Sequence, residues 1–405
     1  MQENSRLAMP FSQPFYVLAK PVGASCNLRC TYCYYLEKSA YYPNDTRHWM
    51  DDATLESFIC AYIQSQPSPY VLFTWHGGEP LLRPLSFYNK VYELQQKYAG
   101  NRTIDNCIQT NGVLLNEGYC AFFKEHSWLV GLSIDGPEAL HDACRVDAKG
   151  RPTFQAVSDA IHLLNRWEVQ WNALVTVNAA TVAHPLEIYY FLKDFGCTFI
   201  QFAPVVERKQ SATTDDRLAA PNDYRSMRVT SESLLPGQWG QFLCALFDEW
   251  VQNDVGTVFI QHFDATLANW MGHPPGLCTF SRTCGQALAM EFNGDVYACD
   301  HYVFPEFLLG NLRTRSFMEM LLSPSQIRFG QNKRDSLPKQ CLECDFLNIC
   351  NGECPKNRFC FDVYGEPGLN YFCSDLKHFF THTASWMQSY VERYGHLRAQ
   401  ACRIC

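Results

Sequence analysis

The sequence predicts an α/β fold with a parallel sheet in its first half, followed by a smaller, cysteine-rich domain. Three observations support this prediction. Short β-like runs alternate with helical patterns over residues 16–203, the loops between them are short, and cysteine density rises between residues 277 and 373. Repeated βα units with short connections form a parallel sheet, which can be an open barrel or a doubly wound sheet.

The individual elements follow from residue type and spacing. Runs rich in β-branched or aromatic residues predict strands at 16–20, 70–75, 106–110, 129–134, 172–177 and 198–203. Apolar residues at helical spacing predict helices near 52–64, 85–98, 116–126, 153–167 and 185–195. Because active-site groups of such sheets gather in the loops after the strands, polar residues in those loops are the candidates for function.

The second half of the chain has a different pattern. A polar stretch at 207–236 predicts a bridging loop, and helices are expected near 239–253 and 375–394. Between them, residues 277–373 lose regular periodicity, which indicates a domain organised by bound metal more than by a large apolar core. We therefore expect an N-terminal extension (1–14), a barrel domain (15–236), a bridging helical region (237–276), a cysteine-rich domain (277–380) and a C-terminal helix and tail (381–405).

Composition restricts the compartment and the partners. The chain has 405 residues and a formal net charge of −8, which argues against a nucleic-acid partner because phosphate binding favours a basic surface. It has neither a run of roughly eighteen apolar residues nor a signal peptide, so we expect no membrane segment and a cytoplasmic protein. In a reducing compartment, its 20 cysteines indicate metal ligation or redox chemistry.

The first cysteine cluster is the most specific functional signal. Cys26, Cys30 and Cys33 have the spacing C-x3-C-x2-C in the loop after the first predicted strand, and Tyr32 lies inside the motif. An electron-transfer [4Fe–4S] cluster takes four cysteines. Three cysteines leave one iron without a protein ligand, and an open position is typical of a catalytic metal site. A zinc site is the alternative, but it would need a fourth ligand, and none follows at the usual spacing.

A glycine-rich turn follows the second predicted strand. Gly78 and Glu79 belong to the sequence Gly-Gly-Glu-Pro at 77–80. The glycines allow the backbone to approach a ligand closely, and the Glu79 carboxylate can accept a hydrogen bond from a ligand ammonium group. Alone, this motif is only a turn. Its place downstream of the cysteine cluster makes it a candidate for ligand binding.

Polar residues also follow the third and fourth predicted strands. Gln109 and Asn111 present amides, Ser133 and Asp135 present a hydroxyl and a carboxylate, and Arg145 lies downstream. Together with the preceding loop, they could bind a ligand that carries an amine, a carboxylate and a ribose. Turn capping is the structural alternative for Asn111, Ser133 and Asp135, and a surface charge is the alternative for Arg145.

A second set of eight cysteines lies in the C-terminal part of the chain, at Cys278, Cys284, Cys299, Cys341, Cys344, Cys350, Cys354 and Cys373. Eight thiols would complete two [4Fe–4S] clusters with four ligands each. Two four-cysteine zinc sites would use the same number of thiols, so the spacing leaves both metals open. The cysteine cluster upstream favours iron.

With both cysteine sets considered, the chain resembles the radical SAM enzymes that carry a SPASM domain, and among them the anaerobic sulfatase-maturating enzymes. The resemblance spans residues 15–380. Beyond the cysteines, it rests on the motifs at 77–80 (GGEP), 109–112 (QTNG), 133–137 (SIDGP) and 293–301 (NGDVYACDH). It implies a partial (β/α)6 TIM-like barrel with a C-terminal SPASM domain, three [4Fe–4S] clusters and S-adenosylmethionine.

The resemblance also assigns ligands. The first cluster would be bound by Cys26, Cys30 and Cys33. One auxiliary cluster would be bound by Cys278, Cys284, Cys299 and Cys354, and the other by Cys341, Cys344, Cys350 and Cys373. S-adenosylmethionine would contact Tyr32, Gly78, Glu79, Ser133 and Arg145.

Family members convert a cysteine or serine of a sulfatase to Cα-formylglycine. By resemblance, Asp300 is the base that removes the thiol or hydroxyl proton, close to the cluster ligand Cys299. The alternative is that Asp300 is only a hydrogen-bond partner of the cluster. The peptide would contact Tyr35, His76 and Gln109. The chain departs from the family pattern at His76, where many relatives have glutamine.

Two other functions are compatible with cysteine clusters of this kind. A different SPASM-type peptide-modifying enzyme, such as a thioether-forming maturase, often carries an N-terminal recognition domain, for which a barrel starting near residue 15 leaves no room. A non-catalytic iron–sulfur electron carrier would need four thiolates on every cluster. The leading hypothesis predicts a sulfatase polypeptide and a flavodoxin- or ferredoxin-like electron donor as partners, without nucleic acid or a membrane.

Overall fold

The computed structural model describes residues 14–43, 48–210, 218–221 and 228–394. Its main sheet has ten strands in the order β10-β9-β8-β1-β2-β3-β4-β5-β6-β7. From β1 to β7 each strand pairs in parallel with the next. These strands are Tyr16–Ala19, Tyr70–Trp75, Thr103–Thr110, Leu129–Ser133, Trp171–Val177, Phe199–Pro204 and Phe259–Ile260. The predicted parallel sheet is therefore confirmed.

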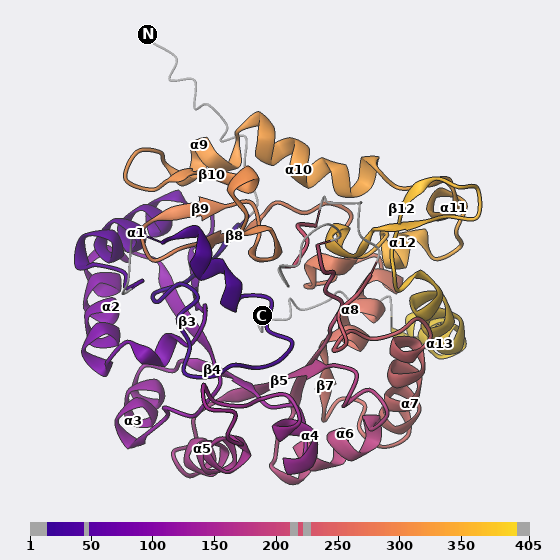
Figure 1. Ribbon diagram of the computed structural model, residues 1–405, viewed down its shortest axis with the longest axis horizontal. Helices are drawn as coiled ribbons and strands as arrows, with labels where there is room; N and C mark the ends of the chain where they lie inside the picture. The colour runs from indigo at the N-terminus through magenta and orange to yellow at the C-terminus, as the bar shows by residue number, and fades with distance from the viewer. Residues whose placement is uncertain (1–13, 44–47, 211–217, 222–227, 395–405) are drawn as a thin grey trace.

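The helices that connect strands β1 to β6 lie in an arc outside the curved sheet (Figure 1). They are α1 (Asp52–Ser65), α2 (Leu85–Tyr98), α3 (Glu117–Glu125), α4 (Glu138–Asp142), α5 (Phe154–Arg166) and α6 (Pro185–Asp194). A doubly wound sheet would carry helices on both faces. Of the two predicted arrangements, the structure is thus the open barrel, with β7 and β10 at the edges of the sheet.

Strand β2 shows how the order of residues determines which side chains point to each face of this sheet. Phe73 and Trp75 are fully buried and contact Phe58 of α1, with ring centres 5.6 and 5.9 Å apart. Leu72 and Thr74 alternate with them and are only half-buried. Since alternate side chains of a strand point to opposite faces, the large aromatic residues hold the helices outside, and smaller side chains line the inside of the barrel.

Strand β3 starts three residues before the predicted strand, at Thr103. Asp105 interrupts the apolar pattern there and argues against an earlier start, whereas the predicted strand begins with the polar Asn106. The structure accommodates Asn106 because its side-chain oxygen accepts hydrogen bonds from Trp75 Nε1 (2.9 Å) and Gln95 Nε2 (2.8 Å). A polar residue with buried partners can thus continue a strand that propensity alone would end.

The cysteine-rich region adds three strands to the same sheet, which the sequence pattern did not predict. They are β8 (Ala287–Met290), β9 (Asp295–Tyr297) and β10 (Leu308–Asn311). Strand β8 pairs in parallel with β1, and β9 and β10 continue antiparallel. The C-terminal half is therefore joined to the first barrel strand by backbone hydrogen bonds.

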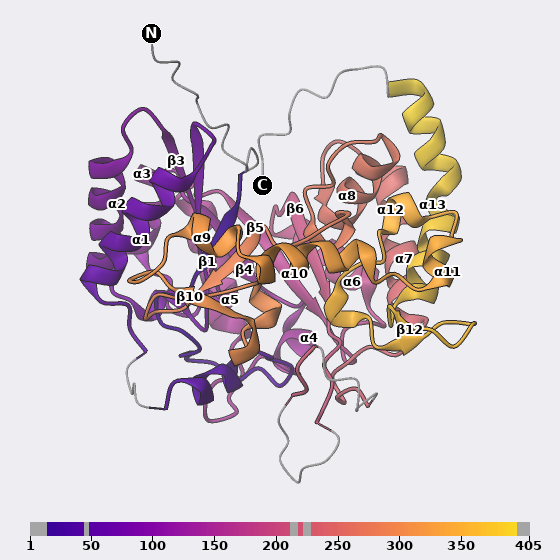
Figure 2. The ribbon, with the colours of Figure 1, turned by 90° about the horizontal axis from the view of Figure 1, so that it is seen from above.

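Short elements complete this region. They are α9 (Phe317–Leu321), α10 (Pro324–Asp335), α11 (Lys339–Leu342), α12 (Leu347–Cys350) and the hairpin of β11 (Cys360–Phe361) and β12 (Pro367–Leu369). Their brevity matches the predicted loss of periodicity. Figure 2 places α11, α12 and β12 beside α7 and α13, away from the helices α1 to α3.

The predicted helices at 239–253 and 375–394 correspond to α7 (Gln238–Asn253) and α13 (Cys373–Tyr394). An additional helix, α8 (Gln261–Trp270), follows β7. The Asp375 carboxylate accepts hydrogen bonds from Gly237 N and Gly240 N, both at 2.9 Å. Helix α13, which begins with Cys373, is thereby fixed to α7. None of the described helices is both long and apolar enough to cross a membrane.

Candidate active site

The loop after β1 carries the first three cysteines, Cys26, Cys30 and Cys33, and all three are half-buried. The backbone N–H groups of Arg29 and Thr31 bond to the segment that follows α4, at 2.7 and 3.0 Å. Burial has the largest effect on the pKa of Cys26, and charges on Cys30 and Cys33 raise it further. The structure therefore brings the three predicted thiols together at the carboxyl end of β1.

The environment of these thiols suits metal ligation. Burial raises the pKa of Cys26 to about 12 and that of Cys30 to about 11. Such thiols keep their protons at neutral pH unless a cation stabilises the thiolate. Leu28 N and Asn111 Nδ2 donate to Cys26 Sγ at 3.3 and 3.7 Å. Three half-buried thiols, two of them with a strongly raised pKa, match the needs of bound iron better than those of a free nucleophile.

Gly78 brings the loop after β2 against the cysteine loop. A Cβ atom at this position would lie only 2.0 Å from the Ser25 carbonyl oxygen. Gly78 N donates to Gly23 O and Glu79 N donates to Ser25 O, both at 2.8 Å. The close backbone approach predicted for Gly78 is therefore made to the cysteine loop itself, and no larger residue fits there.

Glu79 connects the loops after β2 and β3. Its fully buried carboxylate accepts three hydrogen bonds of 2.8 Å, from Leu81 N, Thr110 Oγ1 and Asn111 N. Burial raises the pKa of Glu79 to about 7, and these hydrogen bonds act in the opposite direction. Asn111 thus contacts both Glu79 and Cys26, which places the two candidate loops and the cysteine cluster in one site.

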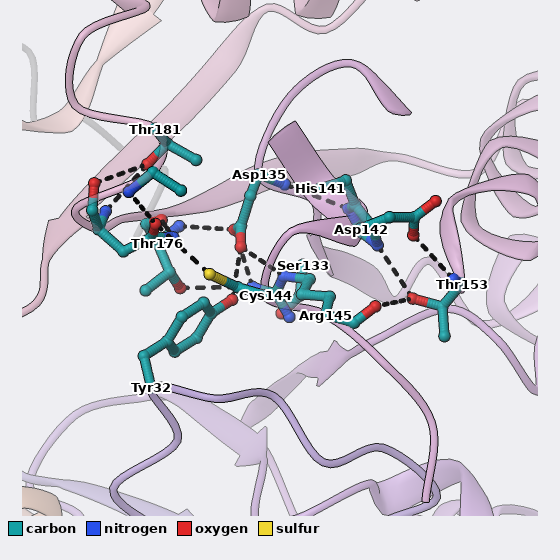
Figure 3. Close-up of polar contacts among 12 residues, drawn as sticks. Tyr32, Ser133, Asp135, His141, Asp142, Cys144, Arg145, Thr153, Thr176 and Thr181 are labelled. Atoms are coloured by element: carbon teal, nitrogen blue, oxygen red, sulfur yellow. Dashed lines mark hydrogen bonds and ion pairs between the residues drawn. The ribbon is translucent and has the colours of Figure 1, made fainter. Parts of the chain in front are cut away.

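Asp135 forms the centre of a buried polar cluster (Figure 3). Arg145 pairs with it, with Nε 2.9 Å from Oδ2 and Nη2 3.1 Å from Oδ1. Tyr32 OH donates to Oδ2 at 2.5 Å, and Thr176 N donates to Oδ1 at 2.9 Å. Arg145 is therefore neither exposed nor unpaired. Through Tyr32, this cluster fixes the cysteine loop to β4 and β5.

Ser133 and Gln109 lie at the ends of two neighbouring strands. Gln109 Nε2 donates to Ser133 Oγ at 3.0 Å. Cβ of a larger residue at Gly131 would lie 2.2 Å from Gln109 Oε1, so the glycine makes room for this side chain. The pair lines the inner side of the barrel, on the same face as Thr74.

Asp300 begins the 3-10 helix η4 (Asp300–Tyr302), one residue after Cys299. Its carboxylate forms an ion pair with Lys20 Nζ and accepts a hydrogen bond from Tyr34 OH at 2.5 Å. Burial would raise the pKa of Asp300, but the Lys20 ammonium group holds it well below its usual range. The predicted base is thus an ionised carboxylate between β1, the first cysteine loop and the Cys299 segment.

Lys20 and Glu291 are functional candidates that the sequence pattern did not single out. Lys20 is fully buried, and its ammonium nitrogen lies 3.9 Å from the Tyr35 ring centre. Tyr35 OH in turn donates to the buried Glu291 carboxylate. One available signal was a lysine that closes an otherwise apolar strand at its carboxyl end, where active-site groups gather.

The three residues expected to contact a peptide lie in two places. Tyr35 and His76 both contact Lys20, with His76 Nδ1 3.4 Å from Nζ, whereas Gln109 contacts Ser133. Burial lowers the pKa of His76 to about 4, so its ring is neutral at pH 7. Its Nδ1 accepts from Gly77 N at 2.8 Å, which leaves the ring proton on Nε2.

The eight later cysteines gather in two groups. Burial is the main cause of the raised pKa values of Cys284, Cys299, Cys354, Cys341, Cys350 and Cys373. In the first group, a charge on Cys278 raises the pKa values of Cys284, Cys299 and Cys354 further. In the second group, a charge on Cys341 raises the pKa of Cys350 and Cys373, and one on Cys344 raises those of Cys341 and Cys373. These effects act between cysteines that the resemblance assigns to the same cluster, and the ligand assignment itself stays a prediction.

An open barrel with a three-cysteine loop after its first strand, joined to a region with two further cysteine groups, defines the radical SAM enzymes with a SPASM domain. Family models agree with this class. The model of the radical SAM superfamily matches residues 21–185, and the SPASM model, an iron-sulfur cluster-binding domain, matches residues 278–345. Proteins of this class bind iron–sulfur clusters and S-adenosylmethionine.

Individual relatives identify the family within this class. A serine-type anaerobic sulfatase-maturating enzyme of Bacteroides thetaiotaomicron is 55% identical over 93% of this chain and 91% of its own length. A cysteine-type enzyme of Clostridium perfringens is 31% identical over 91% of this chain and 95% of its own. A solved structure described as native anSMEcpe with bound AdoMet and Kp18Cys peptide superposes with a TM-score of 0.82 at 29% identity, over 94% of this chain and 100% of that chain. The chain belongs to the anaerobic sulfatase-maturating enzymes.

Proposed function

We propose that this chain oxidises a serine side chain of a sulfatase to Cα-formylglycine. The main observation behind the proposal is the ionised Asp300 directly beside Cys299. Its carboxylate forms an ion pair with Lys20 and accepts a hydrogen bond from Tyr34. This arrangement places a proton acceptor next to a candidate ligand of an electron-accepting cluster. The preference for serine over cysteine rests on the serine-type relative at 55% identity.

We assign the cluster ligands to the three cysteine groups described above, with Cys26, Cys30 and Cys33 around the first cluster. Cys26, Cys30 and Cys33 have the spacing C-x3-C-x2-C, with no fourth ligand at the usual spacing for zinc, and this supports a four-iron cluster at the first site. When bound, the first cluster and S-adenosylmethionine supply the radical that removes a hydrogen atom from the target carbon.

The chain's own residues then have separate tasks. Asp300 accepts the proton of the target hydroxyl, while the Lys20 ammonium group keeps the carboxylate ionised before that transfer. Tyr34 orients the carboxylate through its hydroxyl. Cys299 would hold an auxiliary cluster that could accept the electron released with the proton. The proton and the electron would then leave the substrate in the same direction.

Further residues are assigned to the ligands. We propose that S-adenosylmethionine contacts Tyr32, Gly78, Glu79, Ser133 and Arg145, and that the peptide contacts Tyr35, His76 and Gln109. The polar cluster of Arg145 and the inward-facing pair of Gln109 and Ser133 support this assignment. The two family-model segments fall inside the proposed barrel domain (15–236) and the proposed SPASM domain (277–380).

The electron donor and the compartment are also proposals. A flavodoxin- or ferredoxin-like protein would supply the low-potential electron that the first cluster needs. The cytoplasm is the proposed location, since a reducing compartment keeps unligated thiols such as Cys60 and Cys120 reduced.

The test uses reconstituted full-length enzyme, S-adenosylmethionine, a reductant and matched sulfatase peptides that carry serine or cysteine at the target position. We expect a mass loss at the serine together with hydrazine reactivity, which reports an aldehyde. A thioether-forming enzyme would change the mass without hydrazine reactivity. Cleavage of S-adenosylmethionine with both peptides unmodified would exclude sulfatase maturation.

A variant tests the role of Asp300. Asp300→Asn should keep its iron and still form 5′-deoxyadenosine, yet yield little formylglycine, because the neutral amide cannot accept the proton. The matched control is Asp335→Asn, at an exposed aspartate paired with Arg334. Wild-type product formation by Asp300→Asn would remove this residue from the mechanism.

A further inference from the structure

One short loop connects the two auxiliary cysteine groups. Cys350 ends α12 and belongs to one group, and Cys354 belongs to the other. The three residues between them all have positive φ angles, 49° at Asn351, 69° at Gly352 and 52° at Glu353. Non-glycine residues rarely adopt this conformation, and it persists only where the surroundings hold it. The loop therefore needs a fixed partner.

Arg358 is that partner. Its side chain donates from Nε to Gly352 O (2.8 Å) and from Nη2 to Asn351 O (2.9 Å) and Glu353 O (3.2 Å), and its Nη1 donates to Lys333 O. The guanidinium group thus bonds to the carbonyl of every residue between Cys350 and Cys354. A planar fork of donors can make these contacts together, whereas an ammonium group presents a single point charge.

The charge of Arg358 is buried and is not neutralised through these bonds. The residue is 3% exposed, and all four acceptors are neutral carbonyl oxygens. Its acceptors Asn351 O, Gly352 O and Glu353 O all lie between Cys350 of one cysteine group and Cys354 of the other. One buried cation is therefore close to both auxiliary sites.

We propose that Arg358 is a positioning residue that holds the two auxiliary cluster sites together and raises the reduction potentials of both clusters. The inference rests on the proposed cluster ligands. A cluster with four thiolate ligands carries negative charge, and accepting an electron increases that charge. A buried cation nearby favours the reduced form. Arg358 would thus favour electron uptake at both auxiliary sites.

Reconstituted full-length Arg358→Gln and Arg358→Lys test this proposal through iron content and redox titration followed by electron paramagnetic resonance, without any peptide. We expect Arg358→Gln to keep about twelve irons and to lower both auxiliary potentials. Arg358→Lys should restore much of that shift because it keeps the charge. The potential of the first cluster should not change. The matched control is the exposed Arg334→Gln in α10.

Each outcome of the iron measurement and the redox titration either supports or overturns the proposal. An iron-replete Arg358→Gln enzyme with wild-type auxiliary potentials would overturn the proposal. Loss of auxiliary iron in Arg358→Gln that Arg358→Lys recovers would support it. Loss in both variants would support the positioning role, because only the planar guanidinium group can make the three contacts to the loop together. A wild-type enzyme without auxiliary clusters would instead refute the ligand assignment. None of these results depends on the sulfatase substrate.

Discussion

At the scale of single residues, the unusual feature of this site is a fully buried lysine. Lys20 lies between the Tyr35 ring, His76 and Asp300, and its only ionised partner among these is Asp300. Removing one member of a buried ion pair leaves the other charge without compensation, whereas removing both leaves none. The stability of the site should therefore depend on whether the two residues are changed singly or together.

Lys20→Met should lower the free energy of unfolding by about 3–5 kcal/mol, the usual cost of an uncompensated buried charge. The double variant Lys20→Met/Asp300→Asn should recover much of this loss, because neither charge remains. Thermal unfolding of both reconstituted variants measures the difference. Lys90→Met, which removes an exposed ion pair with Asp52, is the control and should change little. A double variant no more stable than Lys20→Met would contradict the buried-pair interpretation.

Gly78 gives a second prediction at this scale. In Gly78→Ala the new methyl group would meet the Ser25 carbonyl oxygen at 2.0 Å, so the cysteine loop must move. We expect the first cluster to be lost and the auxiliary clusters to remain, which would leave about eight irons per chain. Iron counting measures this loss. The control Gly118→Ala adds a methyl group whose nearest contact is 3.3 Å, in a helix, and should keep all its iron.

At the scale of elements, the sequence predicted the parts whose physical signal is local. The six strands and five helices of the barrel appear within a few residues of their predicted positions, because alternating and helical apolar patterns determine them. Strands β8 to β10 were missed because they are short, and because the last three residues of β8 are buried on both faces of the sheet, so alternation is absent. The contacts of Lys20 and Arg358 depend on residues far apart in the sequence, which no local pattern reveals.

Helix α8 contains a histidine that makes the fold sensitive to acid. His262 packs edge-on against Trp239 and Phe280, and burial lowers its pKa from 6.5 to about 4. Below pH 6.5 the unfolded chain therefore binds a proton that the folded chain does not. Stability is lost as the pH falls from 6.5 towards 4, and the loss from this group is about 1.4 kcal/mol one pH unit below the unfolded pKa.

His262→Phe should reduce this sensitivity. We expect the difference in unfolding temperature between about pH 7.5 and about pH 5.5 to be smaller in the variant than in the wild type. The exposed His162→Phe is the control, since its ring meets solvent in the folded chain. An equal pH dependence in His262→Phe and the wild type would show that another group causes the acid sensitivity.

At the scale of the whole molecule, the barrel and the cysteine-rich region share one sheet. Tyr16 N donates to Gln286 O and Lys20 N donates to Met290 O, both at 2.8 Å, so β1 is bonded to β8 along its length. The same strand β1 leads into the first cysteine loop, and β9 leads to Cys299 and Asp300. The distance between the first cysteine loop and the proposed base is thus set by the three adjacent strands β1, β8 and β9 of one sheet and does not depend on a flexible linker.

This shared sheet predicts that a change at an auxiliary site reaches the first strand of the barrel. Cys299→Ser replaces a proposed cluster ligand two residues after β9. Weaker metal binding there should loosen β9 and β8, and amide hydrogen exchange should become faster in these strands and in β1. Exchange in α5, outside the sheet, should stay as in the wild type. Cys60→Ser in α1 is the matched control, because this thiol belongs to none of the three cysteine groups. In Cys299→Ser, amide exchange could become faster in β9 while it stays slow in β1. The two halves of the sheet would then open independently. The geometry of the site would have to be maintained by side-chain contacts such as the pair of Lys20 and Asp300.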